Sequence, residues 1–303
     1  MSGGAGFIGS HLVDALLARG DEVLVLDDLS SGRERFLDPG ARFEKVDIRA
    51  AEAARLLLDF RPDAVSHHAA QISVSVSVRD PLLDADINLR GGLNLLSAAA
   101  EAGARFVFAS SGGQVYGEPP VIPTPETVPE RPVSPYGVSK LAFDRYLAAF
   151  RRQHGLAYVS LRYANVYGQR QNPHGEAGVI AILCEWYLGR REFRIHGAGR
   201  DTRDYVHVAD IVRANLLAID SEAIGEFNIG TGRETDVITL HRLVGEALGI
   251  EKPAQHGPPR PGDIARSALD SGLAARELGW LPQVGLEEGI RQTAAWFASG
   301  ADR

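Results

Sequence analysis

Tyr136 and Lys140 are the residues whose types and spacing point most directly to proton transfer. They occur in the segment Ser134-Pro-Tyr-Gly-Val-Ser-Lys140, where Ser134 suits a helix cap and Pro135 suits the first helical position. Residues at positions i and i+4 share one helix face. An ammonium beside a phenol favours the phenolate and lowers the phenol pKa from about 10. The spacing therefore predicts a tyrosine that serves as a general base near neutral pH. A chance surface pair is the alternative.

A glycine-rich segment at the start of the chain predicts a dinucleotide site. Ser2-Gly-Gly-Ala-Gly-Phe-Ile-Gly9 places glycines at 3, 6 and 9, which permits a tight turn and close approach of a pyrophosphate to the following helix. An acid, Asp27, ends an apolar segment about 20 residues later, where it would bind the adenosine ribose and repel a 2′-phosphate. The pattern favours NAD over NADP. A plain glycine turn and a solvated Asp27-Asp28 turn are the alternatives.

Only Met1 and Ser2 precede the first of these glycines. A dinucleotide-binding loop of this kind follows a strand, and the first, central strand is apparently missing from this chain. Either translation begins upstream of Met1 or the chain lacks a core element. We expect an upstream start, because the remaining motifs are intact.

Apolar segments alternate with helical patterns in the first half of the chain, which predicts a Rossmann-like, doubly wound parallel α/β sheet. The expected strands are 22–27, 63–67, 105–109 and 158–163, and the expected helices are 11–19, 50–60, 88–102, 135–154 and 179–188. We expect loops at 169–178 and 253–262 from their Gly and Pro content. The predicted NAD-binding domain covers 1–166, with 204–230 returning to it. A smaller substrate domain, 167–203 and 231–303, would close over the carboxyl ends of the strands.

Composition excludes several classes of partner. The formal net charge is −7, which opposes nucleic-acid binding. No apolar segment approaches the roughly 20 residues of a membrane span, and the N-terminus does not resemble a secretory signal. The single cysteine, Cys184, fits a reducing cytoplasm. We assign no metal ligand.

The motifs together resemble the extended short-chain dehydrogenase/reductase superfamily (NAD-dependent epimerases and dehydratases), and within it the UDP-glucose 4-epimerases. The resemblance runs over essentially the whole chain. Its most specific parts are the glycine loop, Ala-Ser-Ser-Gly-Gly-Gln-Val-Tyr-Gly at 109–117 and the tyrosine–lysine segment. The other matching segments are 25–29, 46–49, 67–71, Asn88, 161–168, 202–208, 227–232 and 259–263.

The resemblance implies epimerisation at C4 of a UDP-hexose through a transient 4-keto sugar, with Tyr136 taking the proton and NAD the hydride. Lys140 would hold the nicotinamide ribose and tune Tyr136. The implied NAD-binding residues are Gly3, Gly6, Phe7, Ile8, Gly9, Asp27, Asp28, Asp47, Ile48, Ala69, Ala70, Asn88, Ser110, Tyr136, Lys140 and Tyr163.

The same resemblance implies a set of substrate-binding residues. Arg203 and Arg260 would neutralise the diphosphate, Asp263 would accept a hydrogen bond from the uridine ribose, and Asn165 would contact the sugar or its diphosphate. Small Ser267 would leave room for an N-acetyl group at C2, so that the acetylated sugars are substrates too. The full set is Gln71, Ser73, Tyr136, Asn165, Val179, Arg203, Arg260, Asp263 and Ser267. A homodimer through helices near 88–102 and 136–154 is also implied.

The chain departs from the family pattern at the third catalytic hydroxyl. The family's usual position is Gly112 here, and the hydroxyl of Ser111 lies one residue earlier. Two glycines, Gly112 and Gly113, could let the backbone re-aim Ser111, which predicts that Gly112→Ser is tolerated. We include Ser111 with Tyr136 and Lys140 as catalytic residues.

Neighbouring residues weigh against related chemistries. Nucleotide-sugar 4,6-dehydratases need an Asp-Glu pair where this chain has Gly113-Gln114, and Gln114 cannot titrate. A keto-sugar reductase shares Tyr136 and Lys140 and remains an alternative. A non-catalytic NAD-binding protein of the same fold is the alternative from another class, although such relatives usually lose the tyrosine or the lysine.

Overall fold

The structure is a computed structural model that describes residues 1–174, 178–258 and 264–301. Its larger sheet is parallel and runs β2–β1, then residues 1–3, then β3–β4–β5–β9. Ser2 joins the two groups of strands, because it pairs with Leu26 on one side and His67 on the other. The strands are β1 (Leu24–Asp27), β2 (Arg42–Lys45), β3 (Ala64–His67), β4 (Arg105–Ser111), β5 (Tyr158–Tyr163) and β9 (Gly225–Ile229).

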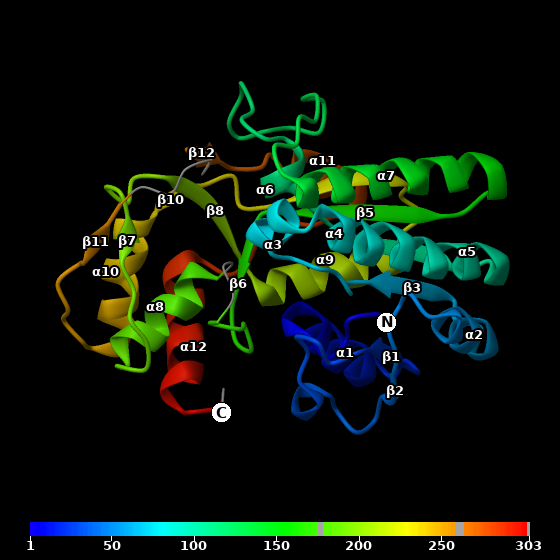
Figure 1. Cartoon of the computed structure of the whole chain (residues 1–303), viewed down its shortest axis with the longest axis horizontal. Helices are drawn as coiled ribbons and strands as arrows, with labels where there is room; N and C mark the ends of the chain where they lie inside the picture. The colour runs from blue at the N-terminus through cyan, green and yellow to red at the C-terminus, as the bar shows by residue number, and fades with distance from the viewer. Residues whose placement is uncertain (175–177, 259–263, 302–303) are drawn as a thin grey trace.

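Helices cover both faces of this sheet (Figure 1). One face packs against α1 (Phe7–Arg19) and α9 (Val208–Asp220), and the other against α2 (Ala51–Phe60), α5 (Gly92–Ala102) and α7 (Pro135–His154). Apolar side chains of β1, β4 and β5 are buried on both faces, as expected of a doubly covered parallel sheet, and they are accompanied by buried polar side chains such as Ser66, His67 and Arg162. The alternation in the sequence therefore predicted this layered α/β arrangement correctly.

The helix predicted over 135–154 has those bounds, because Ser134 accepts a hydrogen bond from the Gly137 amide at 3.1 Å and Gly155 ends it in a left-handed conformation. The helix predicted over 88–102 begins earlier. Asp80 caps α4 (Pro81–Ala85), a π-helical turn η2 (Asp86–Gly91) follows, and α5 continues from it. The cap at Asp80 and Pro81 was the signal for this earlier start.

A smaller sheet lies beside the first, on the left of Figure 1. Its strands are β6 (Asn165–Tyr167), β8 (Thr202–His207), β10 (Glu234–Asp236) and β12 (Arg266–Ser267). The other three strands each pair with β8. The helices α8 (Val179–Tyr187), α10 (Val237–Leu248) and α12 (Leu286–Ala298) share a second apolar core with it. The chain returns to the larger sheet through α9 and β9, whereas β8 pairs with the smaller one.

Short elements complete the fold. They are η1 (Glu34–Phe36), α3 (Val74–Arg79), α6 (Gly112–Val115), α11 (Gly272–Leu278) and the parallel pair β7 (Ile195–His196) with β11 (His256–Gly257). The β11 strand interrupts the stretch 253–262 that composition predicted to be a loop. Within the three described ranges, none of the helices has the length and apolar character needed to span a bilayer.

Candidate active site

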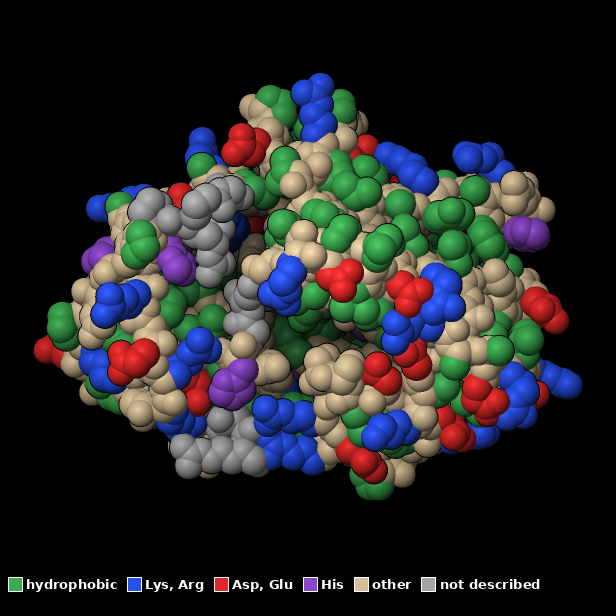
Figure 2. All heavy atoms as spheres, viewed as in Figure 1, with side chains coloured by type: hydrophobic (Ala, Val, Ile, Leu, Met, Phe, Trp, Pro, Cys, Tyr) green, Lys and Arg blue, Asp and Glu red, His purple; other side chains and the backbone are tan. Residues whose placement is uncertain are grey.

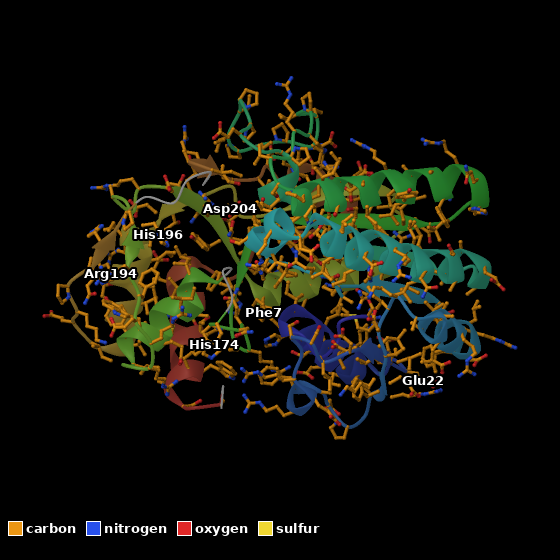
Figure 3. All side chains as sticks on the ribbon, viewed as in Figure 1. Phe7, Glu22, His174, Arg194, His196 and Asp204 are labelled. Atoms are coloured by element: carbon orange, nitrogen blue, oxygen red, sulfur yellow. The ribbon has the colours of Figure 1, made fainter. Side chains whose placement is uncertain are left out.

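The glycine loop lies at the carboxyl edge of the larger sheet and leads into α1, whose first residue, Phe7, is labelled in Figure 3. Gly3 has φ +69°, and a Cβ there would come within 2.5 Å of the Ala69 nitrogen. A Cβ on Gly9 would overlap the Gly3 carbonyl oxygen. These two glycines are therefore required by the packing of the protein itself.

Gly6 differs from its two neighbours in the motif. A Cβ on Gly6 would approach one atom, the Gly3 carbonyl oxygen at 3.2 Å, so the packing of the loop opposes a side chain here far less than at Gly3 or Gly9. An added side chain there would instead occupy the space before the amino end of α1, where an anion is stabilised. Phe7 and Ile8 are partly exposed at this end, and Figure 2 shows the surface hollowed near the middle of this face. The loop therefore has the form of a phosphate cradle.

Asp27 ends β1 beside this loop. Its carboxylate accepts hydrogen bonds from the Ala5 amide at 3.0 Å and the Leu29 amide at 2.9 Å. Burial raises its pKa, and the two amide bonds oppose that rise. Asp28 accepts from the hydroxyl and amide of Ser30 and stays on the surface side. Asp27 is thus fixed where a ribose hydroxyl on the loop could reach it.

Asp47 and Ile48 follow β2 and have different surroundings. Ile48 is buried in the core. Asp47 forms an ion pair with Arg49, which also pairs with Asp86 at 2.8 Å, and the Arg49 hydrogen bonds hold the pKa of Asp47 below its usual value. Ala69 and Ala70 follow His68 after the end of β3, and the Ala69 backbone lies next to Gly3.

Tyr136, Lys140 and Ser111 come together where β4 ends against the first turn of α7. The Lys140 ammonium is buried, donates to the Ala109 carbonyl at 2.9 Å and lies 5.7 Å from the centre of the Tyr136 ring. The Ser111 side chain hydrogen-bonds with Tyr136. The structure therefore unites the three residues that we predicted to be catalytic.

The electrostatics of this group differ from the sequence expectation. Burial raises the pKa of Tyr136 to about 12, and the bond from Ser111 only partly opposes it. Burial also lowers the pKa of Lys140 to about 8. The expectation that Lys140 would lower the phenol pKa is wrong for the protein alone, because the ammonium is directed at the Ala109 carbonyl and desolvation dominates.

Gly112 is closely packed, contrary to the expectation that serine would be tolerated there. A Cβ on Gly112 would overlap the Leu269 side chain and lie 3.1 Å from the Arg162 carbonyl oxygen. A Cβ on Gly113 would meet only the Asn165 amide oxygen, at 3.7 Å. The Leu269 side chain thus occupies the space that a serine side chain at position 112 would need.

A buried polar network supports Tyr136 and Lys140 from behind. The Asp84 carboxylate is fully buried and accepts hydrogen bonds from Gln71 at 2.8 Å, Asn88 at 3.1 Å and Ser139 at 2.5 Å. The Asn88 amide and the Gln71 backbone also exchange two bonds, at 2.8 and 3.0 Å. Ser73 caps α3 and is tied to the Gln71 side chain. Asp84 and Ser139 were missed by sequence analysis, because an acid inside a helix gives no signal of burial.

Two further predicted cofactor residues are fixed by buried partners. Tyr163 accepts a hydrogen bond from Asn215 at 2.8 Å and contacts His68 at 3.3 Å. Ser110 lies 3.5 Å from the Asp144 carboxylate, which also pairs with Arg162 at 3.0 Å. Ser110 and Tyr163, near the carboxyl ends of β4 and β5, are therefore held in place by buried hydrogen-bond partners.

A separate pocket of about 210 Å³ opens between β6, α8 and β8. It brings together three predicted substrate residues, Asn165, Val179 and Arg203. The neighbouring strand β12 places Ser267 opposite Arg203 in parallel register, with Ser267 nearly buried. Arg260 and Asp263 lie outside the described residues.

The same pocket has an aromatic wall that sequence analysis missed. Phe193, His196 and Tyr205 line it, and Figure 3 labels His196, the last residue of β7. Phe193 and His196 lie in a segment without a motif, so only their spacing could have indicated that they share a site. Tyr205 lies in the matching segment 202–208 but was not assigned a role. Flat rings beside an arginine and an amide suit a planar base joined to a phosphate.

The α/β fold, with a glycine loop, Tyr136 and Lys140 at one edge of its larger sheet, is typical of nucleotide-dependent enzymes. The chain belongs to the NAD dependent epimerase/dehydratase family, whose sequence model matches residues 1–230.

Within the family the chain is similar to named epimerases. It is 48% identical to a UDP-glucose 4-epimerase of Mycolicibacterium smegmatis, over 98% of this chain and 97% of that protein. The structure of a UDP-glucose 4-epimerase from Thermotoga maritima with UDP-glucose superimposes with a TM-score of 0.96 at 48% identity, covering 99% and 98% of the two chains. A Thermus thermophilus UDP-glucose 4-epimerase in complex with NAD gives 0.92 at 48% identity, covering 98% and 97%.

Proposed function

We propose that the protein interconverts UDP-hexoses that differ at C4, such as UDP-glucose and UDP-galactose, using NAD. The observation that carries this proposal is the position of Tyr136. Its phenol joins Ser111 and Lys140 at the carboxyl edge of the larger sheet, while Asn165 connects this edge to the pocket of Arg203. The similarity to UDP-glucose 4-epimerases over nearly the full chain supports the same function.

The residues of the glycine loop fit NAD. Gly6 leaves the cradle open, Asp27 is fixed to receive the adenosine ribose, and Lys140 lies where the nicotinamide half would end. When bound, NAD supplies reversible oxidation at the sugar C4. Asn88, Ser110 and Tyr163 would position its nicotinamide half.

The protein's own part in the reaction is proton movement and orientation. Tyr136 would take the proton of the 4-hydroxyl at its phenolic oxygen and return it when the alcohol re-forms on the opposite face. Ser111 would hold the same oxygen through its hydroxyl. The diphosphate would stay on Arg203 while the sugar turns, because a charge-assisted bond outlasts the weaker contacts of the ring.

Incubation of purified protein with UDP-glucose, UDP-GlcNAc and dTDP-glucose, followed by product analysis, tests this function. We expect conversion of UDP-glucose to UDP-galactose without net consumption of NADH. A keto-sugar reductase would instead consume NADH with a 4-keto sugar and leave UDP-glucose unchanged. A non-catalytic NAD-binding protein would release NAD on denaturation and convert none of the three.

The cofactor proposal has a matched test in the glycine loop. Gly6→Ala adds a methyl group to the open cradle and should weaken NAD binding on the order of tenfold, about 1.4 kcal/mol, at a smaller cost in stability than Gly9→Ala. Gly9→Ala should lower the free energy of unfolding by about 1–3 kcal/mol, because its methyl group overlaps the Gly3 carbonyl. Nucleotide released from wild-type protein should be NAD. A stoichiometric NADP content would contradict the role of Asp27.

We also propose that the N-acetylated sugars are substrates, because Ser267 is small and lies in register with Arg203. Ser267→Tyr should abolish activity on UDP-GlcNAc and UDP-GalNAc and spare UDP-glucose, whereas Ser267→Ala should convert both pairs. Wild-type protein that converts UDP-galactose but not UDP-GalNAc would show that Ser267 does not set the size limit.

We further propose that the protein forms a homodimer through α7 together with α3 and α4. The exposed large apolar side chains of these helices are Val78, Leu82, Leu83, Val138 and Tyr146. These exposed apolar residues favour α4 over α5 as the second helix of the interface, because the apolar side chains of α5 belong to the core. Light scattering should give a dimer, and Leu82→Glu should give a monomer.

The domain division also stands as a proposal. A unit of 1–166 with 204–230, and a second unit of 167–203 and 231–303, are supported by the separate core around α8, α10 and α12. Because β8 pairs with the smaller sheet, we propose a boundary a few residues after 204. We place the enzyme in a reducing cytoplasm, since its one cysteine, Cys184, is buried and free.

A further inference from the structure

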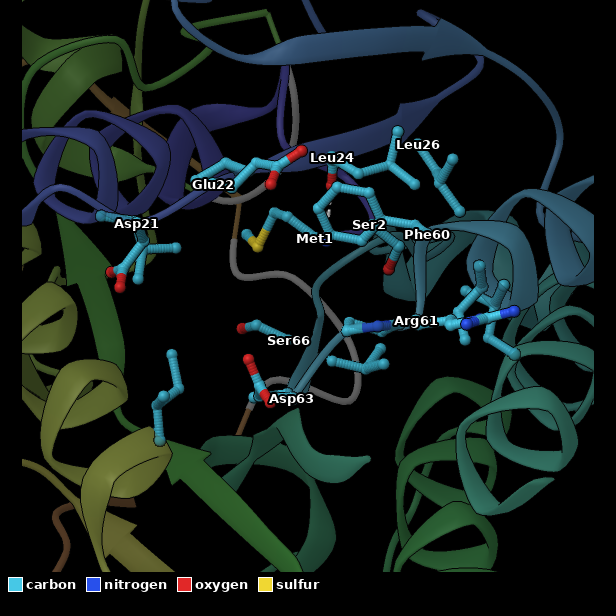
Figure 4. A pocket seen from close by; sticks show the side chains of 18 of the residues that line it. Met1, Ser2, Asp21, Glu22, Leu24, Leu26, Phe60, Arg61, Asp63 and Ser66 are labelled. Atoms are coloured by element: carbon cyan, nitrogen blue, oxygen red, sulfur yellow. Dashed lines mark hydrogen bonds between the residues drawn. The ribbon is translucent and has the colours of Figure 1, made fainter. Parts of the chain in front are cut away.

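Two of the cavities that lie apart from the candidate active site differ in charge. The first, of about 440 Å³, lies between β1 and β3 (Figure 4), and acidic side chains outnumber arginines among the described residues that line it. The second, of about 320 Å³, has the opposite balance, because the described residues around it include one acid, Glu185, and three arginines, Arg33, Arg170 and Arg190. The second cavity therefore favours an anionic ligand.

This basic cavity lies between the segment after β1 and the second apolar core. Arg33 and Phe36 follow β1 of the larger sheet, whereas Arg190 follows α8 and Trp296 belongs to α12. The rings of Phe36 and Trp296 meet edge to face, with 6.4 Å between their centres. A ligand in the cavity would therefore contact both parts of the molecule.

Arg170, in the loop after β6, has a guanidinium that the protein satisfies only in part. Its Nη2 atom forms an ion pair with Asp14 of α1 at 2.8 Å, and the group lies 5.7 Å from the centre of the Phe36 ring. Its Nη1 atom is buried and has no hydrogen-bond acceptor in the described parts of the chain. Because a buried donor without an acceptor is costly, an anionic group beside Nη1 would be stabilising.

Gln171, the next residue of the lining, has an unmatched acceptor. Its side chain is buried, and its Nε2 atom donates to the Val166 carbonyl at 2.9 Å. Its Oε1 atom is buried and receives no hydrogen bond from residues 1–174, 178–258 or 264–301. A ligand that suits both Arg170 and Gln171 carries an anionic group and also a hydroxyl or amino group.

The remaining charges favour the same kind of ligand. Glu185 pairs with Arg190 at 2.9 Å, and Arg190 also donates to the Phe297 carbonyl at 2.9 Å, so this pair adds no net charge. The Arg33 guanidinium adds a positive charge 5.8 Å from the centre of the Phe36 ring. Arginines beside an aromatic ring form a flat surface on which a planar base can stack.

We propose that the basic cavity binds a nucleoside monophosphate. Its phosphate accepts hydrogen bonds from Arg170 and Arg33, and its base stacks on the rings of Phe36 and Trp296. A ribose hydroxyl donates to the Gln171 side chain. The volume lies near the lower end of the range for small-molecule pockets, which suits a mononucleotide better than a dinucleotide. This inference is independent of the proposed function.

The test is titration of the NAD-loaded protein with adenosine monophosphate (AMP), in the presence of UDP to occupy the pocket of Arg203. AMP should change the fluorescence of Trp296 and raise the Tm by about 2–4 °C at roughly ten times its Kd. Trp296→Phe keeps a ring in the wall, so it should abolish the fluorescence change while calorimetry still detects binding. Inorganic phosphate, which lacks a base, and adenosine, which lacks the charge, should each bind about tenfold more weakly than AMP or worse.

Arg33→Ala and Arg170→Ala should each weaken AMP binding on the order of tenfold, because each removes a charged hydrogen bond. Arg35→Ala is the matched control, since Arg35 lies 5.2 Å from the centre of the same Phe36 ring but does not line the cavity, and it should leave the Kd for AMP unchanged. If Arg170→Ala unfolds after losing its pair with Asp14, Arg33→Ala carries the test alone. Equal affinity for AMP and adenosine, a wild-type Kd for Arg33→Ala, or no binding of AMP would overturn the proposal.

Discussion

The two halves of the candidate site are built differently. On the side of Tyr136 and Lys140, polar side chains are buried and bonded to one another, down to the Asp84 carboxylate with its three donors. On the side of Arg203, the pocket is lined by the exposed His196, the partly exposed Phe193 and the buried Tyr205, and Asn165 is exposed. The side chains of the first half are fixed by hydrogen bonds to one another, whereas the second half is an open pocket with room for a ligand.

This difference matches two physical demands. Proton transfer requires a donor and an acceptor held within hydrogen-bond reach, and buried networks provide that rigidity. A sugar that presents both faces to the same base needs space to turn. Changes in the buried half should therefore act on kcat, and changes in the open half on KM.

The largest expected effect is that of Tyr136→Phe. Loss of the general base should lower kcat by about 10² or more, with NAD still bound and the substrate KM nearly unchanged. Steady-state assay with UDP-galactose and nucleotide analysis of the denatured variant measure both. Near-wild-type turnover would assign the base to another residue.

Arg203→Ala is the counterpart in the open half. Loss of a charged hydrogen bond of about 1.5–3 kcal/mol should raise KM by roughly ten- to a hundredfold and leave kcat within about threefold. Arg233, on the neighbouring loop, supplies a control substitution that should change neither constant. An equal fall in kcat would mean that the two halves are not separate.

Ser111 and its glycines give a smaller effect. Ser111→Ala removes one hydrogen bond to Tyr136 and should lower kcat by roughly two- to tenfold. Gly112→Ser should lower stability, since its Cβ overlaps Leu269, whereas Gly113→Ser meets only ordinary contact with Asn165. Thermal melts of both serine variants compare the two positions. A stable, fully active Gly112→Ser protein would show that Leu269 moves aside freely.

The last expected effect is a pH dependence. The pKa of Lys140 is lowered to about 8 by burial, so its positive charge is present below that pH and lost above it. If the ammonium is required, kcat/KM should be halved near pH 8 and fall about tenfold for each further unit. Lys140→Arg stays charged throughout, so its profile should be flat over this range even at lower activity. A wild-type profile that is flat to pH 10 would contradict the requirement.

The sequence predicted the elements whose local signals are strong. Ser134 and Pro135 gave the start of α7, and Gly155 lies where it ends. The spacing of the glycines and Asp27 predicted that they would meet at one edge of the sheet, which they do. These features depend on a few residues close together in the chain.

What the sequence did not predict depends on contacts between distant segments. The raised pKa of Tyr136 results from burial beneath several elements. The packing of Leu269 against Gly112 joins residues far apart in the chain, and so does the bond between Ser139 and Asp84. The aromatic wall of the pocket joins Phe193, in the loop before β7, to Tyr205 of β8. Such features are set by tertiary packing, which no local pattern encodes.

Gln114 connects α6 to α7, because its side-chain oxygen accepts a hydrogen bond from the Ser134 hydroxyl at 3.1 Å, and that hydroxyl caps α7. An engineer who wished to turn this scaffold into a dehydratase would begin by installing an acid there. Gln114→Glu would put the new carboxylate beside the amino end of a 20-residue helix, which stabilises the ionised form. The new acid would then be a poor proton donor at neutral pH. A change of reaction therefore requires a new cap for α7 before it requires a new acid.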